Sequence, residues 1–145
     1  MKKIAFLCTG NSCRSQMAEG FAALMGRGHV KAFSAGVIAA GVNANAVAVM
    51  KEIGIDIASQ WSKTIEDIPL EEMDMVVTLC DNARQSCPAV PAERRVVHIS
   101  VKDPAGTPGD PETVLKEFRR ARDEIGLIVA RLLDGGNPAE PTEKY

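Results

Sequence analysis

Short apolar runs alternate with segments of helical periodicity along most of the chain. The apolar runs cover residues 4–8, 30–34, 75–79 and 95–100. The first and third are apolar almost throughout, which is typical of parallel strands covered on both faces. Helical patterns fill residues 17–25 and 81–86, a segment capped by Asn43 or Asn45 that ends at Gly54, and a long segment capped by Asp110 that ends at Gly135. This order predicts an α/β fold: a three-layer sandwich with a four-stranded parallel sheet and helices on both faces.

Length and charge narrow the class of protein. The chain has 145 residues, which suits one domain, expected over residues 1–134 with a mobile C-terminal tail over residues 135–145. Its 17 basic and 19 acidic residues leave a formal net charge of −2, which argues against non-specific nucleic-acid binding. No apolar run has the length of a membrane span, and the start does not read as a signal peptide. We therefore expect a cytoplasmic protein with no membrane partner, and nothing demands more than a monomer.

The loop after the first strand carries the strongest chemical signal. Cys8 ends the strand, and Arg14 and Ser15 open the helix that follows. A turn of this length can curl its backbone N–H groups around a tetrahedral oxyanion at a helix N-terminus, with the Arg14 guanidinium binding two further oxygens. The same groups would stabilise a Cys8 thiolate. The expected oxyanion-binding residues are Thr9, Gly10, Asn11, Ser12, Cys13, Arg14 and Ser15. A lone cysteine at the end of a buried strand is usually core filler, but the Cys-x5-Arg-Ser spacing favours a reactive thiol.

Two other chemistry-bearing residues follow predicted strands. Cys80 comes directly after the third strand and Asp103 follows the fourth. Because ligands of parallel sheets bind beyond the carboxyl ends of the strands, both should lie on the same rim as Cys8. Each has a plain alternative: Cys80 as a buried core thiol, Asp103 as part of an Asp-Pro turn. Four and six residues separate the members of the two cysteine pairs, spacings that do not fit structural zinc, so no metal site is expected.

The residues around these positions resemble a known family. The resemblance runs through residues 6–20, 34–36, 50–57, 76–80, 87–88, 103–105 and 122–125, which is nearly the whole chain except the tail. These segments are similar to the low-molecular-weight protein tyrosine phosphatase superfamily, and in particular to its thioredoxin-coupled arsenate reductases. The resemblance implies a phosphate-binding loop after the first strand, Cys8 as nucleophile and Asp103 as general acid. It also implies loop support from Asn11, Ser15, Glu19 and Ser34.

The later cysteines favour the reductase over the phosphatase. Hydrolysis needs one thiol, whereas reducing As(V) to As(III) takes two electrons, so a second thiol must complete a disulfide. Cys80 can attack a Cys8 adduct, and Cys87 can then attack Cys80. By resemblance, thioredoxin reduces the resulting disulfide, and the role is arsenic detoxification. Seven helical residues span roughly 10 Å, beyond disulfide reach, so the segment between Cys80 and Cys87 must unwind on oxidation.

Alternatives remain at this stage. One is a low-molecular-weight protein tyrosine phosphatase acting through Cys8, Arg14 and Asp103; weak activity toward a small activated ester is expected in any case. Ala105 and Gly106 follow the Asp-Pro where such phosphatases usually carry an aromatic residue. Another is an oxyanion-binding or redox-sensing module. No cofactor is expected: some relatives bind potassium beside the loop, but here Lys63 offers its own charge. Histidines 29 and 98 have no motif and are expected at the surface or the sheet edge.

Overall fold

The computed structural model describes residues 1–88 and 94–135. Four strands form one parallel sheet in the order β2-β1-β3-β4, from β1 (Lys2–Cys8), β2 (Val30–Gly36), β3 (Met75–Thr78) and β4 (Arg95–His98). The helices are α1 (Arg14–Met25), α2 (Ala44–Lys51), α3 (Asp81–Ser86) and α4 (Pro111–Leu133). The predicted α/β fold with a four-stranded parallel sheet is confirmed.

Apolar runs and capping residues predicted the ends of most helices and strands to within a few residues. Asn43, not Asn45, caps α2, because its side chain accepts from the N–H groups of residues 45 and 46. Asp110 caps α4 and Pro111 fills its first position, as predicted. The third and fourth strands end at Thr78 and His98, one and two residues before their predicted ends. The predicted tail lies outside the described residues from 136 onward.

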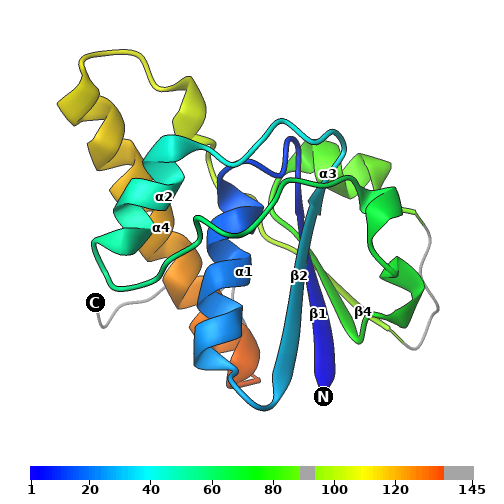
Figure 1. Cartoon of the computed structure of the whole chain (residues 1–145). Helices are drawn as coiled ribbons and strands as arrows, with labels where there is room; N and C mark the ends of the chain where they lie inside the picture. The colour runs from blue at the N-terminus through cyan, green and yellow to red at the C-terminus, as the bar shows by residue number, and fades with distance from the viewer. Residues whose placement is uncertain (89–93, 136–145) are drawn as a thin grey trace.

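Different elements cover the two faces of the sheet. Helices α1, α2 and α4 pack together on one face, and α3 lies on the other (Figure 1). The first face holds the larger apolar core, with Met17, Phe21, Val49, Phe118 and Ile125 among its buried members. The second face holds a smaller core built around two short 3-10 helices, η1 (Ile65–Asp67) and η2 (Leu70–Glu72). Their single turns carry no periodicity, so the sequence did not indicate them.

The sheet register brings the functional candidates to one edge. Cys8 pairs with Gly36 at the end of β1, and Thr78 pairs with His98 at the ends of β3 and β4. A third 3-10 helix, η3 (Pro104–Gly106), begins directly after Asp103. The ends of three strands therefore deliver Cys8, Cys80 and Asp103 to the same rim. None of the helices in the described residues combines the length and apolarity needed to cross a bilayer.

Candidate active site

A pocket of about 270 Å³ opens at this rim. It brings together Cys8, Arg14 and Asp103 from three separate elements. Its remaining lining residues are Thr9, Gly10, Ser12, Cys13, Ile38, Ala40 and Ala105. Asn11 and Ser15 do not line the pocket; both are fully buried behind it. Ile38, Ala40 and Ala105 give this pocket apolar walls in addition to its polar groups.

Backbone contacts hold the 9–15 loop in its curled shape. The segment 37–43 donates four N–H groups to carbonyls of residues 8–12: Val37 to Cys8 at 3.2 Å, Ile38 to Thr9 at 3.0 Å, Ala40 to Gly10 at 2.9 Å and Asn43 to Ser12 at 3.0 Å. Ser62 Oγ donates to the remaining carbonyl, that of Asn11, at 2.9 Å. These bonds occupy the carbonyl oxygens of the loop. Its N–H groups therefore remain available to a ligand. Among the described residues, none of the amides of residues 10–13 donates to a backbone carbonyl.

Two residues make this curl possible. Asn11 has a φ of +48°, a left-handed conformation that asparagine tolerates better than most residues. Gly36 leaves room for the loop, because a Cβ there would lie 2.4 Å from the carbonyl oxygen of Ile38 and 2.6 Å from the amide nitrogen of Asn11. Helix α1 starts directly behind the loop with no side-chain cap and no acidic residue in its first turn. Its free N–H groups and dipole suit an anion.

Cys8 lines the pocket and its sulfur is within hydrogen-bond distance of a hydroxyl group. Its side chain is buried, and its Sγ lies 2.8 Å from Ser15 Oγ. Asn11 Nδ2 donates to Ser15 Oγ at 2.8 Å, which leaves the Ser15 hydroxyl proton able to donate to the sulfur. Ser15 can therefore donate to Cys8 Sγ when that sulfur acts as a nucleophile.

Arg14 and Asp103 form an ion pair in the wall of the pocket. The Arg14 guanidinium is almost fully buried; its Nη1 donates to the carbonyl of Val101 at 3.0 Å, and its Nη2 lies 3.6 Å from Asp103 Oδ2. The Asp103 side chain is half exposed, and its Oδ1 accepts from the Ala105 N–H at 3.0 Å, which fixes it at the start of η3. A guanidinium held in this way can bind two oxygens of an anion, with the Asp103 carboxyl group close to the same anion.

Cys80 touches the loop, and Cys87 lies at the other end of α3. Cys80 Sγ lies 3.2 Å from Thr9 Oγ1 and accepts from the Ala83 N–H at 3.3 Å. Cys87 follows the last residue of α3, and partial burial raises the pKa of its thiol. All the cysteines are free thiols. Cys8 and Cys80 belong to one apolar cluster, and Cys87 packs against it.

Cys13 has a different environment from the other three. Its side chain belongs to the core on the opposite face of the sheet. Burial raises the pKa of its thiol from 9.0 to about 12, so the sulfur stays protonated near neutral pH. Cys13 can therefore contribute its backbone N–H to the loop, while its sulfur is a poor nucleophile.

Two of the predicted loop-support residues, Glu19 and Ser34, form a largely buried polar cluster with Lys63. Ser34 Oγ donates to Glu19 Oε1 at 2.6 Å, and the Lys63 ammonium lies 3.7 Å from the same oxygen. Lys63 Nζ also donates to the carbonyl of Trp61 at 2.9 Å. A potassium ion does not fit these residues, because the ammonium already stands beside the Glu19 carboxylate. Among the described residues, no group of three or more His, Cys, Asp or Glu side chains is arranged to hold a metal ion.

Sequence reasoning missed three polar side chains near the site. Gln16 is fully buried beside Asn11, and Gln60 donates to it from the segment after α2. His98, expected at the surface or sheet edge, lies on the edge strand β4, but its ring contacts Thr78 Oγ1 at 2.7 Å and Asp81 Oδ1 at 3.1 Å, on either side of Cys80. No motif marks these residues; only Gln16's place directly after Ser15 hinted at a role.

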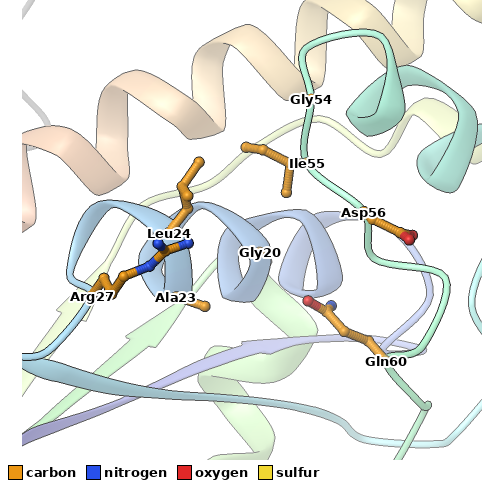
Figure 2. Close-up of a pocket in the computed structure, with 8 residues that line it drawn as sticks. All are labelled: Gly20, Ala23, Leu24, Arg27, Gly54, Ile55, Asp56 and Gln60. Atoms are coloured by element: carbon orange, nitrogen blue, oxygen red, sulfur yellow. The ribbon is translucent and has the colours of Figure 1, made fainter.

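A second pocket, of about 290 Å³, lies away from the rim. Figure 2 shows it between α1 and the segment that follows α2, with Arg27 and Asp56 on its walls and Gln60 at its edge. Its other lining residues are Gly20, Ala23, Leu24, Gly54 and Ile55. None of the residues that the sequence singled out for catalysis lines it.

Comparisons with known proteins show which family and which solved folds the chain is similar to. The family model for low molecular weight phosphotyrosine protein phosphatase matches residues 3–134. An arsenate reductase of Halalkalibacterium halodurans is 50% identical over 135 residues, covering 93% of this chain and 97% of that protein. A solved arsenate reductase in a phosphate-binding state is 35% identical with a TM-score of 0.77, covering 94% of this chain and all of the other. A low molecular weight protein tyrosine phosphatase from T. tengcongensis has a TM-score of 0.79 at 27% identity, covering 93% and 99% of the two chains.

Proposed function

The chain belongs to the low molecular weight phosphotyrosine protein phosphatase family, and on that premise we propose that it reduces arsenate to arsenite through a relay of Cys8, Cys80 and Cys87. The contact that carries the proposal is the one between Cys80 Sγ and Thr9 Oγ1, at 3.2 Å, because it sets a second thiol against the loop that follows Cys8. Hydrolysis of a phosphate ester has no use for that thiol. The likeness to named arsenate reductases supports the same choice.

The first step is attack on bound arsenate. The free N–H groups of the 9–15 loop and the Arg14 guanidinium hold the anion over Cys8. The Cys8 thiolate, stabilised by Ser15, forms a sulfur–arsenic bond. Asp103 gives its proton to the departing oxygen, which leaves as water.

The next two steps move the electrons. Cys80 attacks Cys8 Sγ; the sulfur–arsenic bond breaks, arsenic keeps the electron pair, and arsenite leaves. Cys87 then attacks Cys80, which frees Cys8 and leaves a Cys80–Cys87 disulfide. Two thiols have lost two electrons and arsenic has gained two. We propose that thioredoxin returns them by thiol–disulfide exchange, within the cytoplasm and on a monomer.

Helix α3 must open during the last step. Cys80 and Cys87 flank its six residues, and a helical stretch of this length keeps their Cα atoms roughly 10 Å apart, beyond the reach of a disulfide. A helix so short is marginal by itself. Unwinding brings the third thiol to the second and exposes the disulfide to a reductant.

Weak phosphatase activity is a second candidate. The pocket holds Cys8, Arg14 and Asp103, which suffice chemically for hydrolysis of an activated ester, and Ile38, Ala40 and Ala105 give its mouth apolar walls. Ala105 offers no ring to stack on a phenyl group. We therefore propose slow hydrolysis of small aryl phosphates as a side reaction.

The test is NADPH consumption with arsenate, thioredoxin and thioredoxin reductase. Wild type should turn over, Cys8→Ser, Cys80→Ser and Cys87→Ser should each abolish turnover, and Cys13→Ser is the matched control that should retain it. Hydrolysis of an aryl phosphate by wild type with no arsenate turnover would make the protein a phosphatase. Reversible Cys80–Cys87 oxidation by peroxide with neither activity would make it a redox switch.

A further inference from the structure

A chain of hydrogen bonds runs from Gln60, in the segment after α2, to Cys8 at the end of β1. Gln60 Nε2 donates to Gln16 Oε1 at 2.8 Å, and Gln16 Nε2 donates to Asn11 Oδ1 at 2.9 Å. Asn11 Nδ2 donates to Ser15 Oγ at 2.8 Å, and Ser15 Oγ lies 2.8 Å from Cys8 Sγ. The three amide donors all point toward the sulfur, and a Cys8 thiolate at the end could only accept from the Ser15 hydroxyl.

Backbone partners fix the direction of each side-chain amide. Gln60 Nε2 also donates to the Gln16 carbonyl at 3.0 Å, and Gln16 Nε2 also donates to the Trp61 carbonyl at 3.0 Å. The Lys63 backbone N–H donates to Asn11 Oδ1 at 2.9 Å. Main-chain groups have a single polarity, so turning over any one amide would set like groups against each other. The chain can be polarised in one direction only.

We propose that Gln16 and Gln60 are positioning residues that keep this donor chain aimed at the Cys8 thiolate. Three members of the chain are fully buried: Gln16, Asn11 and Ser15. Water cannot replace a lost partner there, so breaking one bond costs the full free energy of that hydrogen bond. Aligned hydrogen bonds strengthen one another, and a negative sulfur at the end gains from every donor behind it. The inference rests on Cys8 being the nucleophile of the proposed function.

Residues near the Gln60 end of this hydrogen-bond chain provide matched control positions. Gln60 lies at the edge of the second pocket, together with Arg27 and Asp56 (Figure 2). Within the described part of the chain, neither Arg27 nor Asp56 has a side-chain hydrogen bond to Gln16 or Gln60; Asp56 instead accepts from the Ala58 N–H. Asp56→Asn and Arg27→Met therefore change the same pocket wall without touching the donor chain.

The experiment follows alkylation of Cys8 by iodoacetamide in the reduced full-length protein. Peptide mass spectrometry separates Cys8 from the other cysteines, and the rate is recorded across pH. Gln16→Met keeps the length of the side chain and removes its amide. We expect it to slow Cys8 alkylation at neutral pH about two- to tenfold, the range of one hydrogen bond, and to move the half-maximal rate to higher pH. Gln60→Met should act in the same direction with a smaller effect.

The outcomes separate this inference from the proposed function, because alkylation needs no arsenate. Slower alkylation in both glutamine variants, with Asp56→Asn and Arg27→Met matching wild type, supports the positioning role even if arsenate turnover is absent. Wild-type alkylation profiles in both glutamine variants overturn it even if arsenate is reduced. If Gln16→Met fails to fold, the half-buried Gln60→Met decides alone: a wild-type profile overturns the inference, and a shifted one supports it.

Discussion

Replacing Lys63 by methionine removes the ammonium beside Glu19 and keeps the apolar stem of the side chain. The two charges lie 3.7 Å apart, with Lys63 9% and Glu19 18% exposed. At that distance, and with an effective dielectric constant of about 20, two opposite charges attract by about 4 kcal/mol. Glu19 keeps the hydroxyl of Ser34 at 2.6 Å, which offsets part of the loss. We expect the free energy of unfolding to fall by about 2 kcal/mol, below the usual cost of breaking a fully buried pair.

The assay is urea unfolding followed by far-ultraviolet circular dichroism. Tryptophan fluorescence is unsuitable, because Lys63 Nζ lies 4.8 Å from the ring centre of the single tryptophan, Trp61. Lys116→Met removes one exposed lysine as a charge-matched control and should change stability by less than about 0.5 kcal/mol. Adding Glu19→Gln to Lys63→Met should recover part of the loss, because no unpaired carboxylate then remains. The same loss with and without Glu19→Gln would refute the pairing. A second refutation is a rise in wild-type stability on adding potassium, since the ammonium leaves no place for that ion.

Three further predictions concern other parts of the candidate site. Cys87→Ser should release about one equivalent of arsenite and then stop with Cys8 joined to Cys80, which mass spectrometry of the quenched protein would detect; continued turnover would contradict the relay. The buried Cys13 thiol has its pKa raised from 9.0 to about 12, so unfolding releases its proton above pH 9; its contribution to stability is complete below pH 9 and is lost as pH rises toward 12. Cys13→Ala should therefore flatten the fall of the thermal midpoint in that range, and an equally steep fall would count against the burial effect. Gly36→Ala puts a Cβ 2.6 Å from the Asn11 nitrogen and 2.4 Å from the Ile38 oxygen, and should abolish arsenate and phosphate binding measured by calorimetry, or unfold the chain; normal binding would mean that the loop has room that the structure does not show.

The parts of the fold that follow from pattern were predictable from the sequence. Continuous apolar runs marked β1 and β3, and the Asp110-Pro111 pair marked the start of α4. The spacing of Cys8 and Arg14 located the loop, because both flank a strand-to-helix turn. Helices η1 and η2 escaped notice, since a single 3-10 turn has no period to detect.

The parts of the site that depend on tertiary contact were not predictable. Gln16 and Gln60 meet 44 positions apart, and a polar side chain on a buried helix face looks the same in sequence as one facing solvent. Lys63 was expected near the loop, but only the folded chain brings its ammonium to Glu19. Asp103 was placed by its strand, whereas its contact with Arg14 depends on the turn into η3.

The backbone bonds between segment 37–43 and the 9–15 loop have a consequence for how the protein can evolve. Backbone amides and carbonyls bond to each other whatever side chains they carry, so substitutions along 37–43 leave the shape of the 9–15 loop intact provided the main chain keeps its path. The side chains of Ile38 and Ala40, which line the pocket, can therefore be substituted without changing the path of the loop. Under the proposed function, changes at the rim would alter the substrate and changes in α3 would alter the redox relay, while the backbone of the 9–15 loop stays the same.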